Sequence, residues 1–269
     1  MKLAFRKLGN GTPLLILHGL YGNSDNWYTI GKRLAENFEV YLIDQRNHGK
    51  SDHCKEHSYQ SMQLDLLEFF DYHKISEAIL LGHSMGGKTA MLFALLHPEK
   101  ISKLIVVDIA PKAYKSLNDY QKHATDHLNI MQAFLSIDLS IAESRKEVDD
   151  EFSKFVSDLQ TRRFLLKNLE HKKDGSFHWK INIGSLNNAL PNMLDDSDFK
   201  KVKFDKELTS FPVLFIKGER SDYILEKDIY LIKQYFPRAE ITTIFDAGHW
   251  LHSEQPELFL KSINYFLVG

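Results

Sequence analysis

One serine of this chain stands in a pattern typical of nucleophiles. Ser84 lies in a Gly-x-Ser-x-Gly frame between Gly82 and Gly86, directly after the apolar run 78–81. Small residues on both sides permit a sharp turn from strand to helix, which strains the serine backbone and lifts the hydroxyl away from the sheet. The pattern therefore predicts a nucleophilic serine, and with it an enzyme.

The same residues also fit a rival pattern. Gly82 to Thr89 matches G-x-x-x-x-G-K-[ST], the loop that holds nucleotide phosphates, with Lys88 as its lysine. In that case Asp108, after the apolar run 104–107, would help to hold magnesium. Both patterns predict a strand, a glycine loop and a helix, so residues elsewhere in the chain must decide between them.

A nucleophilic serine needs a base, and the position of His249 favours it among the thirteen histidines. His249 follows the last expected strand, 240–245, and precedes the expected C-terminal helix, 256–267. A loop after the final strand lies at the same edge of a parallel sheet as the turn at Ser84. We therefore expect His249 to take the proton from Ser84.

Two aspartates compete for the acid that orients this histidine. Asp108 ends an apolar strand, where a carboxylate must find a partner such as the Nδ1–H of His249. Asp222 lies in a polar loop after the strand 213–217, where water alone would solvate it. Asp108 is the preferred acid and Asp222 the alternative.

Two backbone amides are expected to hold a developing oxyanion. One is the N–H of Met85, the residue after the nucleophile, and the other is the N–H of Leu20, in the glycine-bearing turn 18–22 after an early strand. Tyr21, in that turn, and Trp250, beside the candidate base, are expected to contact substrate.

Apolar runs alternate with amphipathic stretches, which predicts an α/β fold with a mostly parallel sheet covered by helices. The expected strands are 3–8, 14–18, 39–44, 78–82, 104–109, 213–217 and 240–245. The alternation stops between 112 and 210, where charges and aromatic residues accompany helical spacing. We expect residues 1–111 and 211–269 to form the core domain and residues 112–210 to form a helical cap over the carboxyl ends of the strands.

Composition and charge disfavour several classes of function. The 269 residues carry a formal net charge of −2, which offers no general basic field for nucleic acid or a membrane surface. Arg6 and Lys7 interrupt any apolar signal segment, and the single cysteine, Cys54, rules out an internal disulfide, so a cytoplasmic protein is expected. His48, His53 and His57 have only loose metal-ligand spacing, so neither metal nor cofactor is expected.

With these motifs in place, the whole chain resembles the α/β-hydrolase superfamily and, within it, the YbfF-like esterases. The resemblance rests on the segments 18–27, 44–51, 82–91, 107–111 and 248–252. It implies a mostly parallel eight-stranded sheet flanked by helices, a helical cap inserted after the sixth strand, and hydrolysis of acyl esters or acyl-CoA thioesters. It supports Ser84, His249 and Asp108 as catalytic, whereas Asp222 is an addition to the family pattern.

The resulting expectation is a serine esterase or thioesterase that acts on a small-molecule acyl substrate, with short to medium chains favoured. The alternatives are hydrolysis of a C–C bond by the same residues and a ligand-binding protein that has lost catalysis. A nucleotide hydrolase is disfavoured, because it has no use for the C-terminal histidine loop or for the turn at 18–22. Lys88 is then expected on the surface, or at an interface, of the helix that follows Ser84.

Overall fold

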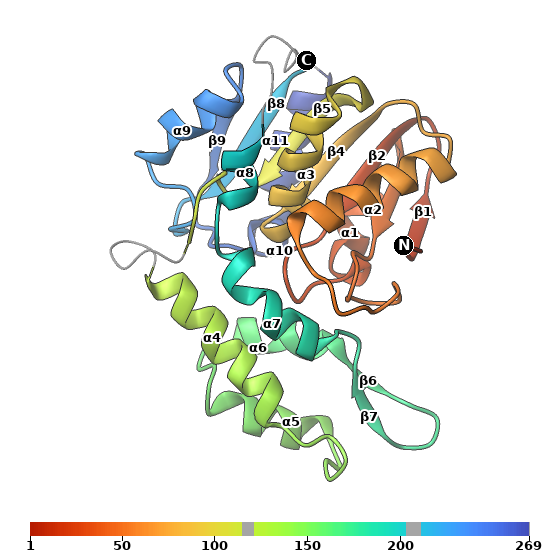
Figure 1. Ribbon diagram of the computed structural model, residues 1–269, viewed down its shortest axis with the longest axis vertical. Helices are drawn as coiled ribbons and strands as arrows, with labels where there is room; N and C mark the ends of the chain where they lie inside the picture. The colour runs from red at the N-terminus through yellow and green to blue at the C-terminus, as the bar shows by residue number, and fades with distance from the viewer. Residues whose placement is uncertain (115–120, 203–210, 269) are drawn as a thin grey trace.

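The main sheet lies at the centre of the molecule, with helices on both of its faces (Figure 1). The computed structural model describes residues 1–114, 121–202 and 211–268. Within these residues the sheet has seven strands in the order β1-β3-β2-β4-β5-β8-β9. Their bounds are β1 Phe5–Leu8, β2 Thr12–Leu17, β3 Phe38–Ile43, β4 Ala78–His83, β5 Ile101–Val107, β8 Val213–Gly218 and β9 Glu240–Ile244.

All neighbours in this sheet are parallel except β1, which runs antiparallel to β3. The expected mostly parallel α/β sheet is therefore confirmed, but the expected number of eight strands is wrong for the described residues. Each of the seven apolar runs forms one strand, and the other two strands, β6 Leu169–His171 and β7 Phe177–Trp179, pair with each other outside the sheet.

Two layers of helices bury the two faces of the sheet. One layer consists of α2 Tyr59–Tyr72, α3 Met85–Leu96 and α9 Asp228–Tyr235, and the other of α1 Tyr28–Leu34, α10 Leu251–Glu254 and α11 Pro256–Val268. Alternate residues of each strand enter the two cores: in β2, Leu15 and Leu17 join the first core, whereas Leu14 and Ile16 join the second. Burial on both faces explains why these strands are continuous apolar runs.

The segment between β5 and β8 forms a separate lobe beyond the strand ends (Figure 1). It contains α4 Gln121–Ser136, α5 Arg145–Ser153, α6 Leu159–Leu165, the hairpin β6–β7 and α7 Ile183–Met193, and a short helix, α8 Ser197–Lys201, lies beside the sheet. The lobe has its own apolar core. The lobe follows the fifth strand of the chain rather than the expected sixth, since the sheet has one strand fewer than expected. Parts of the expected cap, 112–210, lie outside the described residues.

The parallel order brings five loops to one edge of the sheet. The turns after β2, β4 and β5 are adjacent because these strands are neighbours, and the loops after β8 and β9 follow beside them. These five loops carry the residues 18–22, Ser84, Asp108, 218–223 and His249 respectively. The topology thus gathers residues that lie far apart in the sequence at the edge that the lobe faces.

Candidate active site

The turn at Ser84 has the strained geometry of a nucleophile elbow. Ser84 adopts φ 52° and ψ −117° between the end of β4 and the start of α3, a backbone conformation that non-glycine residues rarely adopt. The flanking glycines are required by close packing, since a Cβ at Gly82 would lie 2.2 Å from the carbonyl oxygen of Gly86. A Cβ at Gly86 would lie 2.4 Å from the carbonyl oxygen of Leu17.

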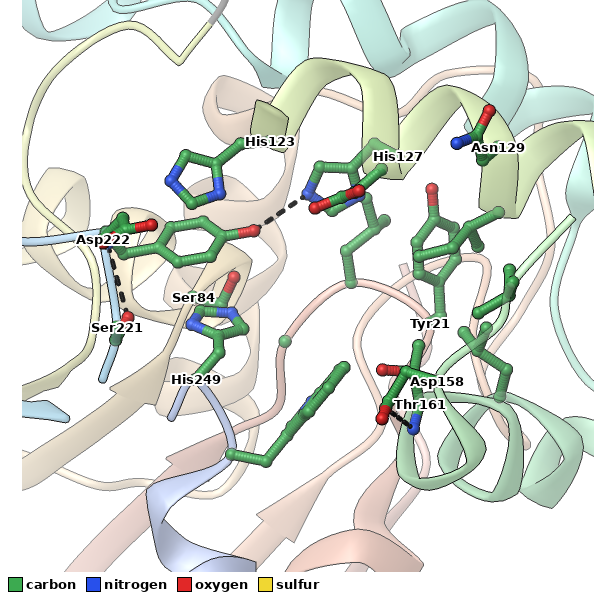
Figure 2. A pocket seen from close by; sticks show the side chains of 18 of the residues that line it. Tyr21, Ser84, His123, His127, Asn129, Asp158, Thr161, Ser221, Asp222 and His249 are labelled. Atoms are coloured by element: carbon green, nitrogen blue, oxygen red, sulfur yellow. Dashed lines mark hydrogen bonds between the residues drawn. The ribbon is translucent and has the colours of Figure 1, made fainter. Parts of the chain in front are cut away.

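Asp108 and His249 form a hydrogen-bonded pair beside this serine. The Oδ2 of Asp108 lies 2.8 Å from the Nδ1 of His249, and the Asp108 side chain is fully buried. Figure 2 shows the His249 ring next to Ser84. Among the described residues no hydrogen bond joins the Ser84 hydroxyl to His249, a looseness that is common before substrate binds.

Two further donors hold the Asp108 carboxylate. The Ser221 hydroxyl donates to Oδ2, and the Gly218 backbone N–H donates to Oδ1 over 3.1 Å. Burial raises the pKa of the Asp108 carboxyl to about 7, although the hydrogen bonds from Ser221 and Gly218 oppose that rise. Burial also lowers the pKa of the His249 imidazole, so this ring is neutral at physiological pH and can accept a proton.

Asp222 lies near this pair but does not join it. Its exposed side chain lines the cavity around Ser84, whereas the carboxylate that His249 contacts belongs to Asp108. Figure 2 shows Ser221 and Asp222 on the same strand-end loop. Of these two neighbours, Ser221 contacts the buried carboxylate.

The residues expected to hold an oxyanion lie close to Ser84. The turn after β2 approaches so closely that a Cβ at Gly19 would lie 3.2 Å from the Cβ of Ser84. Leu20 and Met85 line a small cavity of about 30 Å³ together with Ser84. The geometry thus brings both residues, Leu20 and Met85, beside Ser84 from two different strand ends.

The main cavity, of about 440 Å³, lies between these strand-end loops and the lobe. Ser84 and His249 line it on the side of the sheet, and Tyr21, Trp250, α4 and α6 contribute to its other walls. Tyr21 is buried, and its hydroxyl points toward α4 (Figure 2). Three exposed carboxylates, those of Asp126, Asp158 and Asp222, also line this cavity.

Tyr223 is a site residue that sequence reasoning missed. Its ring stacks on His249 with centroids 3.8 Å apart and an interplanar angle of 17°. The ring of His123 packs 4.0 Å from the ring of Tyr223, and the Tyr223 hydroxyl lies 3.4 Å from Nε2 of His127. The sequence does carry one signal for the two histidines that contact Tyr223: His123 and His127 are four residues apart, so they lie on the same face of a helix.

Of the two expectations for Lys88, the surface position is wrong, and the residue lies instead at an interface within the chain. Its side chain is buried, and its Nζ donates to the backbone oxygen of Asp195, 2.9 Å away. The Tyr59 and Tyr114 rings lie within 5.4 Å and 5.1 Å of the ammonium group. The end of the insertion covers this side of helix α3, and the sequence of the helix alone does not reveal that contact.

No group of three or more His, Cys, Asp or Glu side chains in the described residues is arranged to hold a metal ion. The same part of the chain contains no helix that is both long enough and apolar enough to cross a membrane.

The chain is similar to known hydrolases over nearly its full length. A family model described as the alpha/beta hydrolase fold matches residues 12–256. The chain belongs to the α/β-hydrolase family. This result confirms the resemblance drawn from the sequence motifs.

Two relatives and one solved structure illustrate the similarity. A marine microorganism esterase is 47% identical, with a TM-score of 0.92, over 98% of this chain and 99% of that one. An sn-1-specific diacylglycerol lipase from Danio rerio is 36% identical over 96% of this chain and 79% of its own length. Esterase YbfF from Escherichia coli is 31% identical over 96% of this chain and 94% of its own length.

The buried Lys88 generates a prediction about stability. Burial lowers the pKa of its ammonium group to about 7, so between about pH 7 and pH 10 the unfolded chain binds a proton that the folded chain lacks. The free energy of unfolding therefore gains up to about 1.4 kcal/mol per pH unit over this window as pH rises. Lys88→Met is expected to remove this gain, as measured by urea unfolding at pH 7, 8.5 and 10.

Lys32→Met, at an exposed position of α1, is the matched control and should keep the wild-type slope. An unchanged slope in Lys88→Met would show that the folded protein keeps Lys88 protonated across this window.

Proposed function

We propose that the protein is a serine esterase that uses Ser84, His249 and Asp108 as a catalytic triad. The contact of 2.8 Å between the Asp108 carboxylate and Nδ1 of His249, next to the elbow at Ser84, is the observation that carries the proposal. The relatives named as esterases and as a lipase support ester hydrolysis as the reaction class.

In the proposed mechanism Ser84 Oγ attacks the acyl carbonyl while His249 Nε2 takes the hydroxyl proton. Asp108 fixes the imidazole tautomer, because its carboxylate accepts the Nδ1–H, and it stabilises the imidazolium that forms. The backbone N–H groups of Leu20 and Met85 hold the oxyanion of the tetrahedral intermediate. His249 then gives its proton to the leaving alcohol or thiol, which departs and leaves an acyl-enzyme.

Water completes the cycle by the same steps. His249 removes a proton from water, the resulting hydroxide attacks the acyl-enzyme carbonyl, and the tetrahedral intermediate collapses to release the acid and restore the Ser84 hydroxyl. Each step uses groups already present at the sheet edge. The triad therefore accounts for the full hydrolysis without a metal or cofactor.

The proposed substrate is a small acyl ester or thioester with a short to medium acyl chain. A cavity of about 440 Å³ is within the range of pockets that enclose small organic molecules, and Tyr21, Ile130, Leu165 and Trp250 give it apolar surface. We assign residues 112–210 the role of a cap, because α4 and α6 contribute walls to this cavity. Acyl-CoA remains within the proposed substrate range, and the proposed location is the cytoplasm.

The roles of the triad are tested by substitution. Ser84→Ala should reduce hydrolysis of p-nitrophenyl esters, from acetate to decanoate, to the background rate. Asp108→Asn should lower kcat roughly 10³ to 10⁴-fold, because His249 would then lose its tautomer control. Asp222→Asn is the matched control and should stay within about threefold of wild type, since exposed groups away from the reacting atoms contribute little.

The opposite ranking of the two aspartate variants would assign the acid to Asp222. Wild-type protein that hydrolyses none of these esters would refute the esterase proposal.

The pH dependence follows from the buried pair. Catalysis needs His249 neutral and Asp108 ionised. Because a hydrogen bond couples the two groups, the active form appears in a single titration step, when the pair loses the last proton that either group can release. Burial raises the pKa of Asp108 to about 7, so kcat/KM should rise as pH increases through about 7 and then level off. In Asp108→Asn this acid limb should move to lower pH, since burial lowers the pKa of His249. An acid limb at the same pH in both proteins would contradict the assignment.

Tyr223 is expected to position His249. Tyr223→Leu removes the stacked ring and should lower kcat/KM about tenfold, which corresponds to the upper range of the interaction energy of an aromatic pair. The loss should appear in kcat. Tyr223→Phe keeps the stack and loses only the contact with His127, so it should retain most of the activity. A Tyr223→Phe variant as impaired as Tyr223→Leu would place the effect in the hydroxyl rather than in the stack.

A further inference from the structure

A second cavity, of about 340 Å³, shares Trp250 with the cavity around Ser84. Helix α6 and the 3-10 turn Leu166–Asn168 form one wall, to which they contribute Arg163, Phe164 and Lys167. His252 and Asn26 contribute to the wall on the core side. The proposed catalytic residues do not line this cavity.

Two exposed cations line this second cavity, and neither has a partner among the described residues. Arg163 and Lys167 are four residues apart in a continuous helical segment, so their side chains project from the same side. Neither side chain makes a hydrogen bond or ion pair with any residue that the structure describes. Their charges are therefore available to a ligand.

Two residues that line the same cavity, Asn26 and His252, each have a buried polar atom without a partner among the described residues. The Asn26 Oδ1 accepts the backbone N–H of Asn23 over 2.8 Å, which fixes the amide orientation and leaves its Nδ2 donor without an acceptor among the described residues. The side chain of His252 is 4% exposed, and its ring is held flat against Trp27 with centroids 4.1 Å apart. Its Nδ1 is likewise unpaired within the described part of the chain. Buried polar groups are rarely left this way unless something binds them.

The carboxylate at this cavity is already occupied. Glu254 pairs with Arg220 over 3.2 Å and accepts the backbone N–H groups of Gly248, at 2.8 Å, and Trp250, at 3.2 Å. It therefore does not neutralise Arg163 or Lys167. The second cavity offers several donors and a net positive charge. Three carboxylates line the cavity around Ser84, and the arginine that also lines it, Arg220, is paired with Asp246 and Glu254.

We propose that this second cavity binds a phosphoryl group carried by the leaving-group side of the substrate. The inference rests on the proposed function, because the leaving atom must lie within reach of His249, and Trp250 follows His249 in the chain. A guanidinium pairs with two phosphate oxygens, and an ammonium and an amide can bind the rest. The carboxylates Asp126, Asp158 and Asp222 would repel the same group from the first cavity.

Direct binding tests the site without catalysis. In Ser84→Ala protein, sn-glycerol 3-phosphate should change tryptophan fluorescence through Trp250, whereas glycerol at the same concentration should not. In the Ser84→Ala background, the further substitutions Arg163→Gln and Lys167→Gln should raise the dissociation constant for sn-glycerol 3-phosphate at least about tenfold, since charge-assisted hydrogen bonds are lost. Lys172→Gln with Lys173→Gln, at exposed positions of the β6–β7 turn, makes the same change in charge and should leave binding intact.

A matched pair of substrates tests whether the bound group belongs to the substrate. Butyryl glycerol and its 3-phosphate differ only in the phosphoryl group, and wild type should favour the phosphate ester in kcat/KM. The Arg163→Gln and Lys167→Gln double variant should lower that preference about tenfold through KM, whereas the control pair should keep it.

Two outcomes would overturn the inference: glycerol phosphate binding that is equal in all variants, or binding that weakens without any change in the substrate preference. The second would mean that the cavity holds only a free anion. Wild type that hydrolyses neither ester would instead refute the proposed function, and the binding experiment would still decide whether the cavity takes a phosphoryl group.

Discussion

The burial of one carboxylate is the constraint on which the site depends. Asp108 is fully buried, and a charge in that position is unfavourable unless donors surround it. Those donors come from separate strand ends: Gly218 ends β8 and Ser221 follows it, and His249 follows β9. Satisfying this single side chain therefore fixes the ends of three strands relative to one another and, with them, the orientation of the imidazole beside Ser84.

Short sequence patterns predicted those features that depend mainly on neighbouring residues in the chain. The frame around Ser84 requires small neighbours because of close backbone approaches, and that requirement is visible in the sequence itself. The pairing of Asp108 with His249 was also foreseeable, since a carboxylate at an apolar strand end needs a partner. The parallel sheet was predictable for a similar reason, because strands buried on both faces are continuous apolar runs.

Features that depend on packing between distant segments were not predictable in this way. Lys88 resembles a surface lysine on its own helix, and residues distant in the sequence bury it: the Tyr59 and Tyr114 rings and the backbone of Asp195, more than 100 residues later. Tyr223 lies in a polar loop without periodicity, and its role depends on where His249 and His123 meet it. The strand count was overestimated because it came from the family resemblance, although the chain itself shows only seven apolar runs.

The insertion contacts the site through aromatic rings rather than through the residues of the proposed triad. Tyr223 lies between the imidazole of His249 and the rings of His123 and His127 on α4. A shift of that helix would therefore move Tyr223 and change the position of the proposed base. Trp250 makes a second link, since it packs against Phe164 of α6 and borders both cavities. The core can thus keep the geometry of the proposed triad while the lobe varies in sequence. Substrate choice is then expected to follow the residues of α4 and α6 rather than those of the sheet.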